Sequence, residues 1–394
     1  MSLGTSSDST KFTKRVILCN KTLLASPTET ERRSFNYCQV AKVEKELVLE
    51  VGACPQEHYG SPVRRQLHKL LHSKEFIMAI RWGIVSAGKI SHDFVNSVNS
   101  YPDKGDQVIA AVAARDRQRA AEFAKLHNIP KVFDDYRALA ESKDIDVAYV
   151  GVLNPDHYDV TKLFLENGKH VLCEKPLCLN FKQAQSLLNL AKENKLFLME
   201  AVWSRFAPVY LALEEEIKAG KLGEIRHVEV NFGVPIEKVD RVNKKDFGGS
   251  AVLDIGIYVL QFAQFVYKTE PVKVTAVGNL NENGVDIVDT IVMEYEGNGR
   301  AVLNVDARLK LWNKATVVGT KGRITIEDPF HFPDKLIHVD GTEEKFPLHT
   351  SSIPYNFQNS AGLVYQTLEV ARCIREGKLY SLLDSIECGL QSVG

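Results

Sequence analysis

Three groups of polar, charged and aromatic side chains follow apolar runs in the middle of the chain. The groups are Asn154 to His157, Glu174 to Pro176, and Trp203 to Phe206. Lysine and histidine can carry or exchange a proton, asparagine can hydrogen-bond a ligand, and aromatic rings can wall an apolar pocket. These residue types suit a site that holds a small polar molecule and performs acid–base chemistry on it.

A fourth group of such residues runs from Gly248 to Tyr258. The glycine pair Gly248 and Gly249 opens an apolar helical segment and suits the close approach of another backbone. Asp254 and Tyr258 are four residues apart, so they share one face of that helix. This face is a further candidate for the same site.

Four of these residues also have ordinary structural explanations. Tyr258 fits a core tyrosine with a satisfied hydroxyl, and Asp254 fits a local hydrogen-bond acceptor on its helix. His157 fits the first turn of the next helix, and Trp203 fits a buried ring. The sequence alone therefore leaves a functional and a structural interpretation open for each of them.

The segments that carry the first three groups alternate between strand-like and helix-like patterns. The predicted strands are Ile80–Val85, Gln107–Ala114, Val147–Gly151, His170–Cys173 and Leu196–Glu200, and the predicted helices are Ile90–Val98, Arg117–His127, Tyr158–Asn167 and Phe181–Asn194. Alternation of this kind forms a parallel sheet, since right-handed crossovers place the helices on its faces. We therefore predict an α/β fold with a Rossmann-type doubly wound domain. Its strand ends should bring the three groups to one ligand crevice.

Strands joined by short turns dominate after about Pro208. They are Ile225–Phe232, Val272–Val277, Ile287–Glu296, Gly299–Ala307, Ala315–Gly319 and Arg323–Glu327. Glycine-containing turns at Glu296–Gly299 and Thr320–Gly322 indicate hairpins. We predict a C-terminal α+β domain with a large, mostly antiparallel sheet. One face of this sheet should stay open until helices or a partner subunit cover it.

The turn after the first predicted strand stands where a dinucleotide-binding loop would be. Of the glycines in the pattern G-x-G-x-x-G only the middle one is present, as Gly88, where a side chain would block approach to a pyrophosphate. The small Ser86 and Ser91 keep the tight turn and the helix packing feasible. An ordinary turn with one glycine would explain the same residues. We favour a nucleotide, because the helix that starts at Lys89 and Ile90 offers free N–H groups to a phosphate.

Arg115 stands at the end of the second predicted strand, where an acidic residue would bind the ribose 2′-hydroxyl of NAD. A guanidinium there suits a 2′-phosphate through charge-assisted hydrogen bonds, which favours NADP over NAD. The alternative is a surface arginine followed by Asp116 as the N-cap of the next helix. The two interpretations are compatible.

Two motifs together resemble the Gfo/Idh/MocA oxidoreductase family. They are the E-K-P of Glu174–Pro176 after a strand and the G-G-S-x-x-x-D-x-G-x-Y of Gly248–Tyr258. Further matching strings are RWGIVSAGKIS from Arg81, VAARD from Val112, VLCEKP from Val171, LFLMEAVWSRF from Leu196 and LDIGIY from Leu253. The resemblance covers about residues 80 to 377. It implies an enzyme that transfers a hydride to NADP.

The resemblance also implies roles for individual residues. Tyr258 would be the general acid/base, and Lys175 would lower the pKa of Tyr258 and hold the substrate oxygen and the nicotinamide ribose. Asp254 would orient this pair, while Asn154 and His157 would lie against the nicotinamide or its ribose. The remaining implied residues are Ser86, Gly88, Lys89, Ile90, Arg115 and Glu174 for the cofactor, and Trp203, Arg205 and Phe206 for the substrate, with Arg205 serving either the site or a subunit contact.

By the same resemblance, the substrates would be trans-dihydrodiols, such as trans-1,2-dihydrobenzene-1,2-diol, and aldopyranoses such as D-xylose. The enzyme would be a homodimer that pairs through the open face of the second sheet. One alternative is another sugar or inositol dehydrogenase of the same family. A second alternative is a non-catalytic sensor that binds NADPH.

The composition restricts partners and location. The chain has 49 Lys or Arg against 50 Asp or Glu, so no global charge favours nucleic acid. No uninterrupted apolar run approaches twenty residues, so we expect no membrane span. The seven cysteines lack paired metal-ligand spacing. We expect a cytoplasmic protein without a metal, in which Cys173 and Cys178 are packing thiols.

The two ends of the chain depart from the rest. Residues 1 to 79 hold 12 Lys or Arg against 8 Asp or Glu without a helix or strand pattern. We expect a poorly ordered extension, with a mitochondrial presequence as the alternative. The predicted domains are then 80–205 for the nucleotide and 206–394 for substrate and dimerisation. Gln366 replaces a glutamate of the family pattern and the chain ends early after Gly377, so we expect a loss of stability or assembly.

Overall fold

The computed structural model describes residues 79–381 of the chain. By their contacts, the described residues all belong to one compact unit, the second of two into which the chain divides. The predicted extension, with its targeting alternative, lies outside the described residues apart from Ala79. Residues 382–394 lie outside them as well, so the expectation for the C-terminus stays a prediction.

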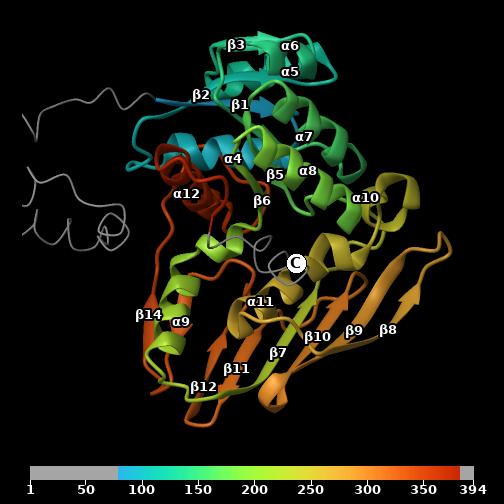
Figure 1. The fold of residues 1–394 in the computed structure, drawn as a ribbon, viewed down its shortest axis with the longest axis vertical. Coiled ribbons are helices and arrows are strands. Elements are labelled where there is room, and N and C mark those ends of the chain that lie inside the picture. Colours follow the sequence, from blue (N-terminus) through green and yellow to red (C-terminus); the bar gives the residue numbers. More distant parts are fainter. Residues whose placement is uncertain (1–78, 382–394) are drawn as a thin grey trace, which may run out of the picture. The chain divides into compact units, whose positions relative to one another are not determined.

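A six-stranded parallel sheet forms the first half of the second unit (Figure 1). Its order, β3-β2-β1-β4-β5-β6, is that of a dinucleotide-binding fold. The strands are β1 (Ile80–Val85), β2 (Gln107–Ala113), β3 (Lys131–Phe133), β4 (Val147–Val150), β5 (His170–Glu174) and β6 (Leu198–Ala201). The helices are α4 (Lys89–Ser100), α5 (Arg117–His127), α6 (Tyr136–Glu141), α7 (His157–Glu166) and α8 (Phe181–Glu193).

The strands at the centre of this sheet are mainly apolar because both faces are buried. All four residues of β4 are buried, and two separate apolar clusters lie on the two sides of the sheet. The predicted doubly wound domain is therefore confirmed, and each predicted strand and helix is present. The sequence pattern missed β3 and α6, which are short and carry too few buried positions to show a periodicity. Asp116 is the N-cap of α5, as expected, and accepts from the backbone N–H of Arg119.

An eight-stranded sheet forms the second half, with the order β14-β13-β12-β11-β7-β10-β9-β8. Its neighbouring strands are antiparallel except for the parallel pair of β7 and β10. The predicted mostly antiparallel sheet is confirmed, and both predicted hairpins are present. The strands are β7 (Ile225–Gly233), β8 (Lys273–Leu280), β9 (Asp286–Tyr295), β10 (Gly299–Asp306), β11 (Ala315–Gly319), β12 (Gly322–Ile326), and two that were not predicted, β13 (Lys335–Ile337) and β14 (Glu343–Lys345).

Several helices and helical turns connect or cover these sheets. They are η2 (Asn154–Asp156), η3 (Trp203–Phe206), α9 (Pro208–Lys218), α10 (Asp240–Asn243), η4 (Lys245–Phe247), η5 (Val252–Gly256, a π-helical turn), α11 (Ile257–Tyr267), η6 (Glu296–Asn298), η7 (Ser360–Gly362) and α12 (Leu363–Arg375). The stretch Lys245–Tyr267 is long and apolar enough to cross a membrane by length and composition alone. However, 67% of its apolar window is buried, so the protein core accounts for its hydrophobicity.

The end of the described chain returns to the nucleotide-binding half and packs on α4. The hydroxyl of Ser97 donates to the carbonyl of Ala361 and accepts from the N–H of Val364. In α12, Gln366 is fully buried, and within residues 79–381 neither atom of its amide has a hydrogen-bond partner. An unpaired buried amide is destabilising, which gives the expected loss of stability at this position a physical basis. The predicted boundary between the nucleotide-binding domain and the substrate domain, at residues 205 and 206, stays a prediction.

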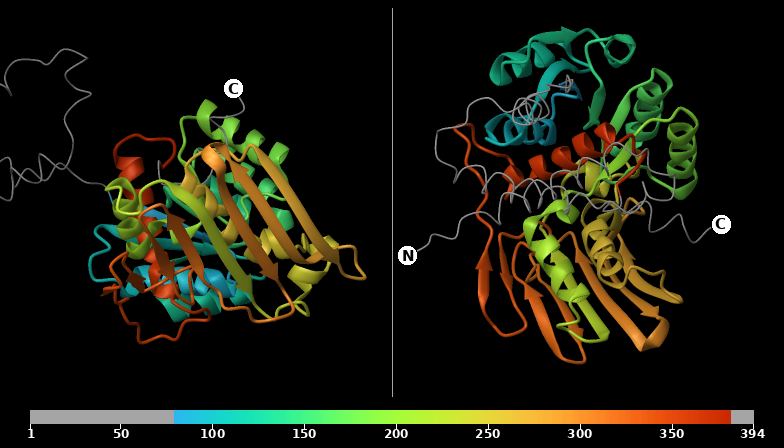
Figure 2. Two further views of the ribbon diagram at one scale, coloured as in Figure 1. Left: turned by 90° about the horizontal axis from the view of Figure 1, so that it is seen from below. Right: turned by 60° about the vertical axis from the view of Figure 1, so that its left-hand side comes forward.

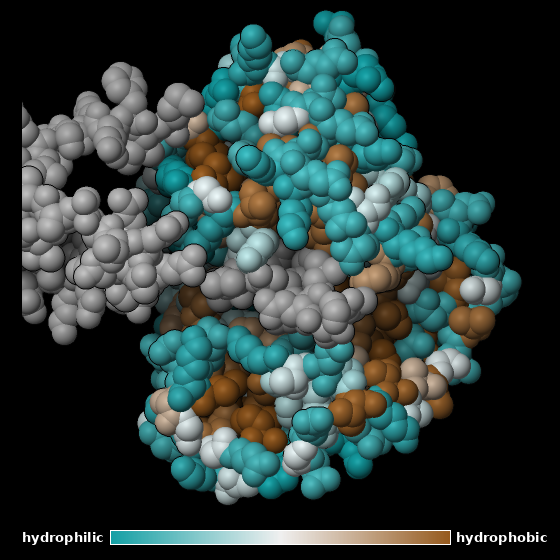
Figure 3. Space-filling view, in the orientation of Figure 1, coloured by the Kyte–Doolittle hydropathy of each residue, from teal (hydrophilic) through white to brown (hydrophobic). Residues whose placement is uncertain are grey.

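One face of the large sheet carries helices, and the other carries none from residues 79–381 (Figure 2). On the bare face, Asn304 accepts from the Thr290 hydroxyl and donates to Asn231, both at 2.8 Å, which links three strands. The edge strand β8 is exposed along its whole length. The visible surface of the nucleotide-binding half is mainly hydrophilic, while apolar atoms are exposed over the half that contains the large sheet (Figure 3). Two apolar side chains of β8, Val277 and Leu280, are exposed.

Candidate active site

The turn between β1 and α4 forms a backbone cradle at the carboxyl edge of the parallel sheet. Ser86, at the position of the first glycine of the nucleotide pattern, has a φ of 99°. Gly88 is the extended N-cap of α4, which no side chain caps. A Cβ on Gly88 would meet only Ser86 Oγ at 3.5 Å and the carbonyl of Gly151 at 3.9 Å. The space beside Gly88 and the N-terminus of α4 therefore fit a pyrophosphate.

The first turn of α4 packs closely on the end of β4. A Cβ on Gly151 would lie 2.6 Å from Ser91 Oγ, and Ser91 is fully buried. A side chain larger than serine at position 91 would push the helix away from the strand. The small residue that the sequence pattern required here is thus explained by packing.

Arg115 lies at the exposed tip of β2, beside this cradle. Its side chain is 71% exposed, and Nη1 lies 3.6 Å from a carboxylate oxygen of Asp156 in η2. Lys89 is also exposed, and Ile90 is half-buried at the start of α4. The surface around the cradle thus carries two cations that a phosphate could contact.

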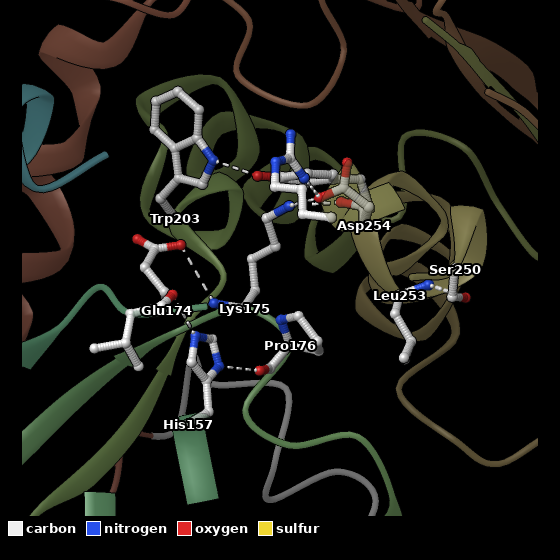
Figure 4. Close-up of polar contacts among 11 residues, drawn as sticks. His157, Glu174, Lys175, Pro176, Trp203, Ser250, Leu253 and Asp254 are labelled. Carbon is white, nitrogen blue, oxygen red and sulfur yellow. Dashed lines mark hydrogen bonds and ion pairs between the residues drawn. The ribbon is translucent and has the colours of Figure 1, made fainter. Parts of the chain in front are cut away.

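Lys175 extends from the end of β5 to the π-helical turn η5 (Figure 4). Its Nζ donates to the backbone carbonyl of Asp254 at 2.5 Å and lies 3.5 Å from the carboxylate of Asp254. Arg241 of α10 pairs with the same carboxylate. Burial by itself would raise the pKa of Asp254, but the charges of Lys175 and Arg241 hold it below its ordinary value. Burial likewise opposes the charge of Lys175, yet Asp254 and Tyr258 raise the pKa of this lysine, which is therefore protonated.

Tyr258 lies on the first turn of α11 beside this ion pair. Its hydroxyl oxygen accepts a hydrogen bond of 2.8 Å from the indole N–H of Trp203, and Lys175 Nζ lies 5.2 Å from the centre of the tyrosine ring. Burial raises the pKa of Tyr258, and the charge of Lys175 opposes this effect without overcoming it. The charge of Lys175 thus acts in the expected direction and lowers the pKa of Tyr258, but the net pKa is raised because desolvation outweighs the nearby cation.

His157 joins the loops that follow β4 and β5. Its Nδ1 lies 2.7 Å from the carbonyl oxygen of Pro176, and its Nε2 lies 3.2 Å from that of Val152. Burial lowers the pKa of this imidazole. Both ring nitrogens face backbone carbonyls of the protein, so this geometry fixes the lysine loop and gives no support to a contact with nicotinamide.

The first and fourth residue groups meet at Gly248. A Cβ on Gly248 would lie 3.3 Å from side-chain atoms of both Asn154 and Pro155, and 2.8 Å from Leu179. Its φ of 68° also favours glycine. The glycine therefore allows the segment before η5 to approach the nucleotide-binding half, which places Asn154 beside the fourth group.

Three other predicted site residues make their main contacts within the protein. Glu174 is buried and accepts from the Tyr149 hydroxyl at 2.7 Å, and burial raises the pKa of Glu174. Arg205 is 3% exposed and donates to Gln261 and Gln264 of α11, so it braces the helix that carries Tyr258. Phe206 lies in the apolar core. Of the predicted aromatic wall, Trp203 hydrogen-bonds to Tyr258.

Two family models match the chain. The model described as "Oxidoreductase family, NAD-binding Rossmann fold" matches residues 80–202, and the GFO/IDH/MocA C-terminal domain matches residues 210–325. The chain belongs to the Gfo/Idh/MocA oxidoreductase family. One similar member is a trans-1,2-dihydrobenzene-1,2-diol dehydrogenase from Xenopus tropicalis, 44% identical over 313 residues, which cover 78% of this chain and 94% of the relative. The human protein of that name is 40% identical over 301 residues, 76% of this chain and 90% of the relative.

Solved structures of the same fold are more distant in sequence. A levoglucosan dehydrogenase in complex with NADH and levoglucosan aligns with a TM-score of 0.68 at 17% identity, covering 79% of this chain and 93% of that one. A 3-ketoreductase from Actinomadura kijaniata with NADP aligns with a TM-score of 0.66 at 23% identity, covering 79% and 94%. This Gfo/Idh/MocA chain is thus an oxidoreductase with a nucleotide-binding Rossmann fold.

The sequence did not predict two residues that lie beside the candidate site: Arg241, which pairs with Asp254, and His331, whose ring lies near that of Tyr258. Arg241 lies in a helix of four residues, and His331 follows β12, so neither stands at the end of a strand in the parallel sheet. No periodic pattern or motif marks either position. Within residues 79–381, no group of three or more His, Cys, Asp or Glu is arranged to hold a metal ion.

Proposed function

We propose that this chain is an NADP-dependent dehydrogenase of trans-dihydrodiols, such as trans-1,2-dihydrobenzene-1,2-diol, and of D-xylose-like aldopyranoses. The observation that carries the proposal is the meeting of Lys175, Tyr258 and Trp203 at the carboxyl ends of β5 and β6, on the same sheet edge as the Gly88 cradle. Relatives named for this dihydrodiol activity, at 40% to 44% identity, support the substrate class.

In this mechanism Tyr258 accepts the proton of the substrate hydroxyl at its phenolic oxygen. The indole N–H of Trp203 already donates to that oxygen and stabilises the phenolate that the oxidation requires. Lys175 provides the positive charge that favours a developing alkoxide, and Asp254 with Arg241 holds Lys175 in position. NADP held by the β1–α4 cradle would supply, through its nicotinamide, the acceptor for the hydride of the carbinol carbon. The product is the corresponding carbonyl compound.

NADP is the proposed cofactor, held by the β1–α4 cradle of Ser86, Gly88, Lys89 and Ile90. Arg115 supports NADP over NAD because its exposed guanidinium follows β2. In dinucleotide-binding folds, the end of this strand is the place that contacts the adenosine ribose. In this proposal Arg115 exchanges its contact with Asp156 for the 2′-phosphate. Arg115→Ala should raise the KM for NADP by at least about tenfold and leave the KM for NAD nearly unchanged.

The test follows NADPH absorbance with trans-1,2-dihydrobenzene-1,2-diol and D-xylose as parallel substrates. Tyr258→Phe and Lys175→Met should each lower kcat/KM by about 100-fold or more, since each removes a group that moves or stabilises charge at the reacting oxygen. Tyr267→Phe is the matched control, because it removes a tyrosine hydroxyl at the far end of α11. Full turnover in Tyr258→Phe would contradict the assignment of the acid/base.

The same assay separates the two alternatives. Binding of NADPH without turnover of any alcohol would favour the non-catalytic sensor. Turnover confined to other sugars or to inositol would favour a different dehydrogenase of this family. The retained lysine and tyrosine support a catalytic protein over a sensor.

The proposed assembly is a homodimer that pairs through the bare face of the large sheet. The hydrogen-bonded Asn231, Asn304 and Thr290 supply a flat, internally satisfied centre for such a contact. Light scattering should give twice the chain mass of 44.1 kDa. A monomeric mass would refute the dimer.

The proposed location is the cytoplasm. Cys173, Cys178 and Cys373 are free and buried, and burial raises the pKa of the Cys178 thiol to about 12. Buried free thiols of low reactivity suit a reducing compartment. Recovery of the protein in a membrane or organelle fraction would contradict this proposal.

A further inference from the structure

One imidazole in the wall of the candidate site has no part in the proposed mechanism. The ring of His331 stacks on Phe232 with centroids 4.8 Å apart, and its centroid lies 5.4 Å from that of Tyr258 and 6.3 Å from that of Trp203. Its Nδ1 is buried and has no hydrogen-bond partner within the described chain. The residue as a whole is only partly buried.

A polar ring at this place needs an explanation. The neighbours of His331 are aromatic, and a phenylalanine would complete the same packing without leaving a buried nitrogen unpaired. The backbone carbonyl of His331 accepts from the Ser204 hydroxyl, which ties the residue to η3 beside Trp203. The imidazole is therefore held beside the rings of Tyr258 and Trp203, with its Nδ1 unpaired within residues 79–381.

The protonation state of the ring defines what it can bind. Burial, together with the charge of Lys175, lowers the pKa of His331 to about 4, so the ring is neutral at pH 7. A neutral imidazole has one N–H donor and one nitrogen acceptor. It can therefore hydrogen-bond a hydroxyl, which also donates and accepts, and it does not attract an anion.

We propose that His331 determines specificity by hydrogen-bonding a second hydroxyl of the substrate, adjacent to the carbinol that loses its proton to Tyr258. The inference rests on the proposed function and narrows its substrates to vicinal diols and polyhydroxylated rings. A site that hydrogen-bonds a substrate hydroxyl discriminates strongly against analogues without it, because its polar group is then left unpaired. A mono-alcohol would leave His331 without a partner.

The test compares trans-cyclohexane-1,2-diol with cyclohexanol, which differ by one hydroxyl, in NADP-linked assays of the full chain. The wild type should favour the diol in kcat/KM by at least about tenfold. His331→Phe should lose at least about tenfold on the diol, mainly through KM, with less than about threefold change on the mono-alcohol. If cyclohexanol is not turned over, its inhibition constant against the diol gives the same comparison.

Two further variants separate hydrogen bonding from packing. His331→Gln should recover part of the diol preference, since an amide also donates and accepts. Phe232→Leu, which alters the ring stacked on His331 without removing a polar group, should affect both substrates alike. Equal losses on diol and mono-alcohol in His331→Phe, or an unchanged preference, would overturn the role of His331. A wild-type protein that oxidises none of these alcohols, nor trans-1,2-dihydrobenzene-1,2-diol, would instead overturn the proposed function.

Discussion

Replacing Gly88 by alanine should strongly weaken nucleotide binding and leave the fold intact. The backbone of Gly88, with φ −87° and ψ 176°, is accessible to any residue. The added methyl would have protein neighbours no closer than 3.5 Å, which is ordinary contact. We expect the free energy of unfolding to change by less than about 1 kcal/mol. The methyl would occupy the space where the pyrophosphate is expected to bind. We expect this clash to cost about 3 kcal/mol of binding free energy, which corresponds to a Kd for NADPH raised by about 100-fold.

The assay measures the Kd by titration calorimetry with NADPH and the unfolding midpoint by circular dichroism. Gly151→Ala is the contrasting variant, because its Cβ would lie 2.6 Å from Ser91 Oγ inside the packed helix–strand contact. That variant should lose about 1–3 kcal/mol of stability, and adding Ser91→Ala should restore part of it. If Gly88→Ala bound NADPH with a Kd within about threefold of wild type, the assignment of the cradle would be refuted.

Three further predictions concern the pair of Lys175 and Tyr258, the turn at Ser86 and the buried Gln366. Oxidation should accelerate as the pH rises, because Tyr258 must lose its proton to act as a base and burial raises its pKa. In Lys175→Met the rise of kcat/KM should move to higher pH, and a pH profile unchanged by that substitution would contradict the coupling. Ser86→Gly removes the unfavourable φ of 99° and should raise the unfolding free energy by about 1 kcal/mol in urea titrations, whereas a loss would show that the turn is unstrained. Gln366→Met should raise that free energy by about 1–2 kcal/mol, since it replaces a buried unpaired amide, and destabilisation would reveal a partner for the amide.

Much of the fold could be predicted because its elements carry local signals. Val147–Val150 is continuously apolar as a strand buried on both faces must be, and Asp116 marks the start of α5 as a capping residue. The missed elements, such as β3 and α6, are short, so tertiary contacts rather than a pattern stabilise them. The strand-end rule placed Lys175 at the carboxyl edge of the parallel sheet, and the family resemblance implied its pairing with Asp254, which lies 79 residues further along the chain.

The individual contacts of the site could not be predicted in the same way. Arg205 and Glu174 follow strands as the site residues do, yet their partners lie in α11 and in β4. Arg241 and His331 lie in segments without a pattern, and only the folded chain brings them to Asp254 and Tyr258. Spacing along the chain fixes which edge of a sheet a residue reaches, and it does not fix where the side chain points.

The sequence by itself determined the parallel sheet, the antiparallel sheet and the glycine at the nucleotide turn. These features depend on periodicity and on position relative to a strand end, which are local properties. The tertiary structure decided that Asp254 holds two cations and that Trp203 donates to Tyr258. It also decided that burial outweighs Lys175 in setting the pKa of that tyrosine. The physical reason is that desolvation and pairing of charges depend on all the atoms around a group, and those atoms come from segments far apart in the chain.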